Sequence, residues 1–151
     1  MADGRTAEPI QARRSMLLTA LFVAQEQFGY LSPEALTRVA ERLDMPVNDV
    51  YAAATYYAMY RFAPVGRHVI KVCEGLSCHL ADGAETLIEH LKLRLGINVE
   101  ETTPDGLFTL QTVQCLASCG SSPAMMVNDV LYEHVTVDQA DLLLDELGGR
   151  P

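Results

Sequence analysis

The sequence lacks the features that would place the protein in a membrane, on nucleic acid or outside the cell. It has no apolar run of about 18 residues, the length that a membrane-spanning helix needs. The N-terminus contains no apolar signal core and no export cleavage site. Basic residues are few, and the formal net charge of −9 argues against a nucleic-acid surface. We therefore expect a cytoplasmic protein.

Motifs for nucleotide binding, hydrolysis and thiol exchange are missing as well. Neither G-x-G-x-x-G after a predicted strand nor G-x-x-x-x-G-K-[ST] occurs, so a dinucleotide or triphosphate has no evident cradle. The G-x-S-x-G motif of α/β-hydrolases is absent, and so is the C-x-x-C motif of thiol oxidoreductases. No substrate pocket has a signature in this chain.

The first sixty residues predict three short helices with apolar residues at helical spacing. These apolar residues are Leu17, Leu21, Ala24 and Phe28 in the first helix, Leu36, Val39, Ala40 and Leu43 in the second, and Val50, Ala54, Tyr57 and Ala58 in the third. Gly29 is placed to end the first helix, and Ser32 and Pro33 to begin the second. The third helix has almost no positive charge, so packing is favoured over DNA reading.

An aromatic run closes this helical part, at Tyr56, Tyr57, Tyr60 and Phe62. We favour core packing as its role. Rings that face outward would instead make a docking patch, and a partner contact is then expected at the three tyrosines and Arg61.

After a hinge at residues 63–66 the pattern predicts alternating strands and helices. Strands are expected at 68–72, 97–101, 107–113, 124–127 and 131–134, the last two as a hairpin around Asn128 and Asp129. One helix should begin at Asp82, with Glu85 as capping-box partner, and end at Gly96. Another should follow the capping box of Thr136 and Gln139. The sum is an α/β sandwich of thioredoxin size.

Four cysteines stand as two close pairs, Cys73 with Cys78 and Cys115 with Cys119. The spacing is C-x4-C, a gap of 36 residues, then C-x3-C. Each pair follows a predicted strand, so four thiolates could meet around one inorganic centre. In the cytosol, such cysteines more often bind metal or do redox chemistry than form structural disulfides.

Three interpretations of the thiols stay open. A [2Fe–2S] cluster takes four thiolates, plant-type examples show a C-x4-C element, and two ligand loops suit its two irons. Structural zinc also takes four thiolates, although its ligand pairs are usually spaced as C-x2-C. Unliganded or redox thiols are the third interpretation. We favour the cluster, which without a substrate pocket implies an electron relay fed by a cofactor on another subunit.

The neighbours of the cysteines suit a buried cluster. Residues 74–77 and 120–123 are predicted loop segments, and the one glycine in each would let backbone N–H groups approach the sulfurs. His79 directly follows Cys78, but a Rieske-type centre needs two histidines, so we expect no ligand there. His68, His90 and His134 show no ligand spacing.

Several sequence blocks carry a resemblance to a known family. They are residues 53–57 (AATYY), 64–68 (PVGRH), 103–108 (TPDGLF), 115–119 (CLASC) and 123–129 (PAMMVND), with Cys73 and Cys78. In these blocks the chain resembles the small thioredoxin-like [2Fe–2S] subunit of the NADH dehydrogenase module of respiratory complex I. It is also similar to the equivalent subunits of NAD-reducing hydrogenases and NAD-dependent formate dehydrogenases.

The resemblance implies a fold of the α/β (α+β) class. A flexible N-terminus, residues 1–14, would precede an N-terminal three-helix bundle, residues 15–63. A thioredoxin-like ferredoxin domain would then occupy residues 64–151.

The resemblance also implies ligands and a partner. Cys73 and Cys78 would bind one iron of a [2Fe–2S] cluster, and Cys115 and Cys119 the other. A flavoprotein subunit that binds FMN and NADH would be the partner, in a complex at the cytoplasmic face of the inner membrane. The cluster would exchange single electrons with the flavin, and this chain alone would have no complete active site. A zinc-stapled interaction module is the non-enzymatic alternative.

Overall fold

The computed structural model describes residues 14–80 and 83–149. The chain divides between Pro64 and Val65 into two compact units, each described by itself below. Residues 1–13 of the predicted flexible N-terminus lie outside the described residues. None of the described helices is both long enough and apolar enough to cross a membrane.

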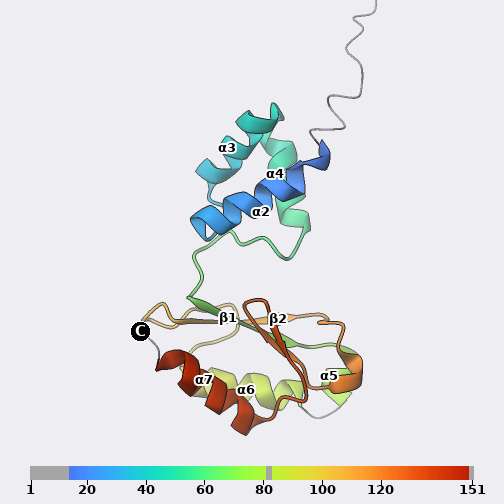
Figure 1. The fold of residues 1–151 in the computed structure, drawn as a ribbon, viewed down its shortest axis with the longest axis vertical. Helices are drawn as coiled ribbons and strands as arrows, with labels where there is room; N and C mark the ends of the chain where they lie inside the picture. Colours follow the sequence, from blue (N-terminus) through green and yellow to red (C-terminus); the bar gives the residue numbers. More distant parts are fainter. Residues whose placement is uncertain (1–13, 81–82, 150–151) are drawn as a thin grey trace, which may run out of the picture. The chain divides into compact units, whose positions relative to one another are not determined.

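The N-terminal unit contains the three predicted helices, α2 (Leu17–Phe28), α3 (Pro33–Leu43) and α4 (Val47–Tyr56) (Figure 1). Gly29 ends α2 with a φ of 79°, a conformation that favours glycine. Ser32 caps α3, where its Oγ accepts a hydrogen bond from the Ala35 N–H at 3.2 Å. Both signals work as the sequence predicts.

Polar contacts from α2 hold the segment that follows α4. The buried Gln25 donates from Nε2 to the Met59 carbonyl at 3.1 Å, and its Oε1 accepts from the Arg61 N–H at 2.6 Å. The buried Tyr60 donates from its hydroxyl to the Leu18 carbonyl at 2.8 Å. The core beside these contacts is apolar and consists of Leu17, Leu21, Ala24, Leu31, Leu36, Val39, Ala40, Leu43, Val50, Ala54 and Tyr60.

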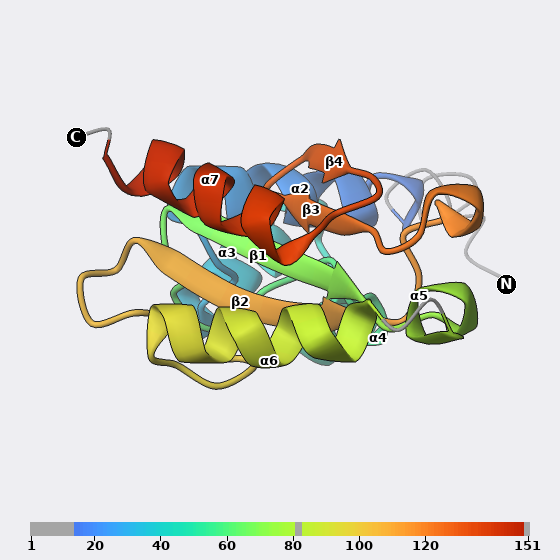
Figure 2. The ribbon, with the colours of Figure 1, turned by 90° about the horizontal axis from the view of Figure 1, so that it is seen from below.

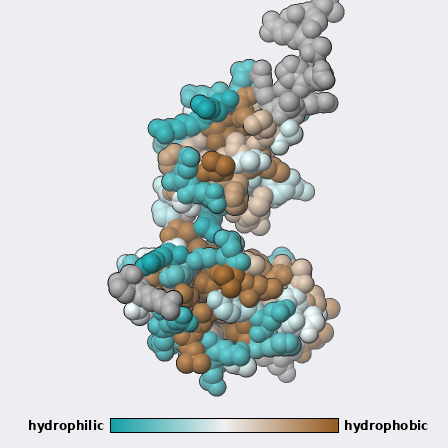
Figure 3. Space-filling model, in the orientation of Figure 1, coloured by the Kyte–Doolittle hydropathy of each residue, from teal (hydrophilic) through white to brown (hydrophobic). Residues whose placement is uncertain are grey.

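Several expectations for this unit were wrong. Phe28 is exposed, and the fourth buried residue of α2 is Gln25. The third helix ends at Tyr56, so Tyr57 and Ala58 lie beyond it and outside the core. Of the four aromatic residues, only Tyr60 is buried; Tyr56, Tyr57 and Phe62 are exposed. Figure 3 shows the resulting mixture of hydrophobic and hydrophilic atoms on the visible face of this unit.

The C-terminal unit is built on a four-stranded sheet in the order β2-β1-β3-β4. The strands are β1 (His68–Cys73), β2 (Phe108–Val113), β3 (Met125–Val127) and β4 (Val130–Tyr132). β1 and β2 are parallel, whereas β3 is antiparallel to both of its neighbours. β3 and β4 form the predicted hairpin, whose turn residue Asn128 has a φ of 54°.

Helices α6 (Ala84–Leu95) and α7 (Val137–Gly148) cover one face of this sheet (Figure 2). The predicted capping box of Thr136 and Gln139 begins α7, and Gly96 ends α6 with a φ of 67°. Between sheet and helices lies an apolar core of Ile70, Val72, Leu87, Leu91, Ile97, Phe108, Leu110, Met125, Val127, Val135, Ala140 and Leu144. The α6 crossover between parallel strands is the connection expected for such a pair. Two shorter elements complete the unit, α5 (Leu76–Leu80) and the 3-10 helix η1 (Cys119–Ser121).

One local prediction for this unit was wrong, and another depends on a residue outside the described range. Residues 97–101 form a turn and not a strand, since Glu100 has a φ of 65° and the Asn98 N–H is bound by the Glu101 carboxylate at 2.7 Å. Beyond this turn, the chain pairs with β2 at an isolated bridge between Thr102 and Thr109. The predicted capping box of Asp82 and Glu85 depends on Asp82, which lies outside the described residues; the structure places Gly83 at the N-cap of α6.

Candidate metal centre

One end of the sheet gathers the three segments that carry the cysteines. The parallel strands β1 and β2 end side by side, with Cys73 opposite Val113. Because β3 is antiparallel to β1, the segment that leads into it arrives at the same end. Backbone bonds fasten these segments, from the Glu74 N–H to the Val113 carbonyl at 2.9 Å and from the Cys73 N–H to the Ala124 carbonyl at 3.1 Å. The topology therefore brings the segments that bear both cysteine pairs to the same end of the sheet.

Cys73 and Cys78 form a buried pair. Cys73 is the last residue of β1 and Cys78 lies on α5, and each exposes no more than 3% of its surface. They pack in a small cluster with Ala84 and Ala124, which Leu116 partly covers. Sequence reasoning expected a loop between the two cysteines, whereas the short helix α5 brings Cys78 back to Cys73.

The two buried thiols have opposite pKa shifts. Burial raises the pKa of Cys73, although the N–H groups of Gly75 and Leu116 partly offset this by bonding its sulfur. Burial also acts to raise the pKa of Cys78. At Cys78, however, hydrogen bonds from the Ser122 hydroxyl, the Ala124 N–H and Cys73 bring the pKa below its ordinary value. The surroundings of Cys78 thus favour a thiolate, the form that binds metal.

Cys115 and Cys119 lie exposed on the loop between β2 and β3. The Ala117 N–H donates to Cys115 Sγ at 3.2 Å, and Ala117 itself has a φ of 59°, which turns the chain back. The hydroxyl of Ser118 donates to the carboxylate of Glu133, beyond β4. This bond lowers the pKa of Glu133, with a smaller contribution from a second serine hydroxyl. A carboxylate therefore anchors the exposed cysteine loop.

Ser122 joins the two cysteine segments. Its Oγ lies 3.5 Å from Cys78 Sγ and 3.2 Å from the carbonyl oxygen of Cys119. Sequence reasoning placed this residue only in a glycine-containing turn and did not single out Glu133. No local pattern would have found Glu133, because its partner Ser118 lies 15 residues away in sequence.

The structure does not join the two pairs into one group. Within residues 14–80 and 83–149, no three His, Cys, Asp or Glu side chains are arranged to hold a metal ion. The buried pair comes together, and the second pair lies on a neighbouring loop that Ser122 connects to it. That all four cysteines bind one centre stays a prediction.

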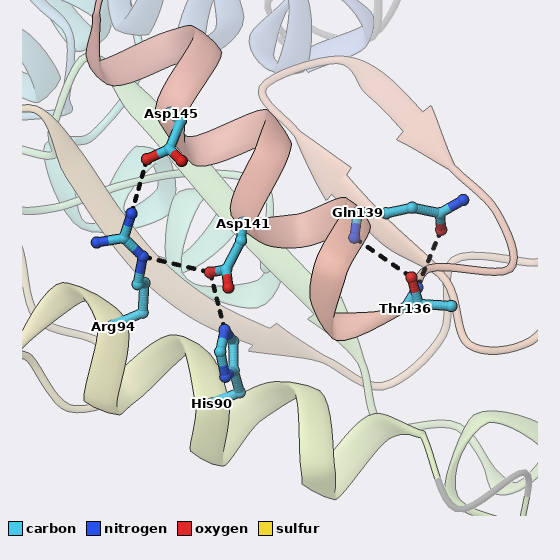
Figure 4. A network of polar contacts seen from close by, with 6 residues as sticks. All are labelled: His90, Arg94, Thr136, Gln139, Asp141 and Asp145. Carbon is cyan, nitrogen blue, oxygen red and sulfur yellow. Dashed lines mark hydrogen bonds and ion pairs between the residues drawn. The ribbon is translucent and has the colours of Figure 1, made fainter.

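The histidines have other surroundings. His79, next to Cys78, is exposed, as is His134. His90 lies on α6 with its Nε2 2.8 Å from Asp141 Oδ1 of α7 (Figure 4). The ring of His68 packs against Phe108 at 5.6 Å between centroids.

The residues present fit an iron–sulfur cluster in their chemistry. The predicted donor set of four thiols lies on segments that meet at one end of the sheet, and backbone N–H groups bond three of the sulfurs. Gly75 forms part of a close cradle, since a Cβ there would lie 3.1 Å from the Gln114 carbonyl oxygen and 3.4 Å from Cys73 Sγ. Glycine is thus the residue that lets the backbone approach this sulfur.

The sequence pattern of the thioredoxin-like [2Fe-2S] ferredoxins matches residues 5–148. The chain belongs to this family. A [2Fe–2S] cluster is accordingly the cofactor, as the spacing of the cysteines predicted.

Relatives within oxidoreductase complexes are similar over most of the chain. A subunit of the NADH-quinone oxidoreductase of Rhizobium meliloti (strain 1021) is 41% identical over 133 residues, which are 88% of this chain and 79% of that protein. The HndA subunit of the NADP-reducing hydrogenase of Solidesulfovibrio fructosivorans is 33% identical over 139 residues, 92% of this chain and 81% of that protein.

A solved structure shares the fold of this thioredoxin-like ferredoxin. An air-oxidized NAD+-reducing [NiFe]-hydrogenase superimposes with a TM-score of 0.75 over 86% of this chain, at 20% sequence identity. The chain spans only 23% of the length of that hydrogenase chain.

Proposed function

We propose that this protein is the [2Fe–2S] electron-transfer subunit of an NADH-quinone oxidoreductase. Its partner is a flavoprotein subunit that binds FMN and NADH, in a peripheral assembly on the cytoplasmic face of the inner membrane. The relatives named for that enzyme support the assignment, since one of them is 41% identical over most of both chains. No complete active site lies on this chain; its task is to hold a cofactor where a partner can exchange electrons with it.

Cys73 and Cys78 hold one iron in this proposal, and Cys115 and Cys119 hold the other. The bound cluster supplies one-electron chemistry, at a potential set by its charge, hydrogen bonds and exposure. The protein residues fix those three quantities. Burial of the first pair removes water from one side of the site, and the backbone N–H groups of Gly75, Leu116 and Ala124 offset negative charge on its sulfurs.

The observation that carries the proposal is the buried pair at the end of β1, next to the loop that bears the other two cysteines. A thiol pair at 3% exposure or less, with N–H donors directed at both sulfurs, is arranged to hold negative charge out of water.

Metal and sulfide analysis of the purified full chain tests the proposal. We expect about two irons and two acid-labile sulfides per chain, visible charge-transfer absorbance, and a one-electron paramagnetic signal after reduction. Zinc without sulfide would overturn the proposal and establish the zinc-stapled interaction module instead.

The parent complex has a second candidate, a hydrogenase that reduces a nicotinamide cofactor. The 33% identity to a subunit of an NADP-reducing hydrogenase favours it. An NAD-dependent formate dehydrogenase is the third alternative for the parent complex. Affinity purification of the chain at its native level, followed by identification of the co-purifying subunits, separates these complexes. A quinone-reductase membrane arm supports the first candidate, and a [NiFe] or [FeFe] hydrogenase subunit supports the second.

A further inference from the structure

Ser122 lies between the two cysteine-bearing segments of the candidate metal site. Among the described residues its hydroxyl contacts both cysteine segments, at 3.5 Å from Cys78 Sγ and 3.2 Å from the Cys119 carbonyl oxygen. The backbone at Ser122 is extended, with φ −68° and ψ 149°. It directly follows η1, so the side chain lies where the exposed loop meets the buried pair.

A hydroxyl has one proton to donate, and here it has two acceptors to choose from. With Cys78 as a thiol, the S–H donates to Ser122 Oγ and the hydroxyl donates to the Cys119 carbonyl. An iron ligand is a thiolate and has no S–H. Rotation about the Cβ–Oγ bond of Ser122 then directs its proton to the sulfur, so the contact is kept with donor and acceptor reversed.

We propose that Ser122 donates a hydrogen bond to the Cys78 sulfur in the cluster-bound protein and thereby raises the reduction potential of the site. This inference rests on the proposed function, because it takes Cys78 as an iron ligand.

The sign of the effect follows from charge. Reduction adds one negative charge, part of which falls on the ligand sulfurs, and a hydrogen bond to a charged acceptor favours the charged form. Cys78 exposes only 2% of its surface, so water does not replace the serine as a donor there. The O–H of Ser122 is therefore worth more than it would be at an exposed sulfur.

The loop around Ser122 is held from the opposite side by the segment after β4. The His134 N–H donates to the Ser121 carbonyl and the Val135 N–H to the Pro123 carbonyl, both at 2.9 Å. These two backbone bonds flank Ser122 and fix its place, while the Ser118 hydroxyl bonds Glu133 farther along the loop. Ser122 is thus a positioned donor and not a residue of a free loop.

The test compares three variants of the full chain with the unaltered protein. Ser122→Ala removes the donor. Ser122→Thr keeps a hydroxyl, and the extended backbone at this position suits a β-branched residue. Ser77→Ala is the control, because it removes a hydroxyl beside Cys78 that has no bond to sulfur among the described residues. The reduction potential is measured by a titration followed by electron paramagnetic resonance. Samples exchanged into D2O are measured by electron–nuclear double resonance for a deuteron coupled to the cluster.

Ser122→Ala is expected to shift the potential to more negative values and to lose one exchangeable deuteron coupling. In Ser122→Thr and Ser77→Ala we expect a reduction potential and a deuteron coupling close to those of the unaltered protein. An unchanged potential and coupling in Ser122→Ala would overturn the inference while leaving the proposed function intact. Absence of iron in the unaltered chain would instead overturn the proposed function. If Ser122→Ala binds no cluster, the test depends on Ser122→Thr. A deuteron coupling retained in Ser122→Thr supports the inference, and a cluster in Ser122→Thr that lacks this coupling refutes it.

Discussion

Asp141 Oδ1 on α7 lies 2.8 Å from His90 Nε2 on α6, and the same oxygen lies 3.3 Å from Arg94 Nε. Arg94 also reaches Asp145 with its terminal nitrogen at 2.7 Å, as Figure 4 shows. These contacts join the two helices that cover one face of the sheet, outside the apolar core between them. They give α6 and α7 a fixed register at their polar edge.

Replacing Asp141 by asparagine should lower the urea midpoint of unfolding at pH 7. The hydrogen bond from His90, with help from the charge of Arg94, lowers the pKa of Asp141, so this carboxylate binds a proton less readily in the folded chain than in the unfolded one. Its contribution to stability is present above its ordinary pKa of 3.8 and is lost as the pH falls through the lower folded value.

The difference between Asp141→Asn and the unaltered chain should therefore shrink when the same urea titration is repeated at pH 3. Asp129→Asn is the matched control, since Asp129 lies in the exposed hairpin turn and has no ion pair among the described residues. An equal loss for Asp141→Asn at both pH values would contradict the electrostatic explanation.

Serine at Cys78 or at Cys115 should remove most of the iron and sulfide from the purified chain. A serine hydroxyl does not ionise near neutral pH and replaces a thiolate poorly, and metal binding contributes to folding. His79→Ala is the control for the surroundings of Cys78, because this exposed histidine is expected not to be a ligand. Iron content and visible absorbance per chain provide the measurement. Full iron in Cys115→Ser would exclude Cys115 from the ligand set.

Alanine at Gly66 should destabilise the protein by about 1–3 kcal/mol, the usual cost of forcing extra atoms into a packed site. A Cβ there would lie 2.8 Å from the Phe108 carbonyl carbon and 2.9 Å from the Phe108 nitrogen, both backbone atoms that cannot turn aside. Gly148→Ala is the control, since its Cβ would meet only side-chain atoms at 3.9 Å or more. Urea unfolding measures both variants; equal midpoints would argue that the backbone at Phe108 shifts freely.

Phenylalanine at Tyr60 should cost about 0.5–1.5 kcal/mol of stability, the typical net contribution of one hydrogen bond. The change deletes only the hydroxyl that donates to the Leu18 carbonyl at 2.8 Å and keeps the buried ring. Tyr56→Phe makes the same chemical change on a side chain that is 81% exposed, and its unfolding midpoint should match that of the unaltered chain. A similar loss in both variants would show that the Leu18 contact is not the cause.

The sequence predicts most of the fold because the deciding signals are local. Helix ends at Gly29, Ser32 and Gly96 depend on the residue itself and one or two neighbours, and all three are where the pattern placed them. The failures depend on particular side-chain contacts. Residues 97–101 have a strand-like composition but are bent into a turn by contacts between Asn98 and Glu101 that a propensity does not contain.

The candidate metal site, like the fold, could be predicted from the sequence only in part. Spacing and strand order predict a ligand set of four cysteines, which stays a prediction, and the topology explains why the segments that bear both pairs meet at one end of the sheet. The role that we propose for Ser122 depends on a contact with Cys78, 44 residues earlier in the chain, which no sequence motif predicts. The prediction of core packing for the aromatic residues failed for another reason. Residue type alone does not distinguish Tyr60 in the core from Tyr56 on the surface.

The crossover through α6 has a consequence for biogenesis. Residues 79–114 separate the two cysteine pairs in the sequence and include α6 and β2, so the proposed set of four ligands is complete only once both elements have formed. A nascent chain that ends at α6 therefore contains Cys73 and Cys78 but not yet the second cysteine pair. If all four cysteines hold one cluster, as we propose, its loading with iron and sulfide must wait until β2 has been synthesised and has paired with β1.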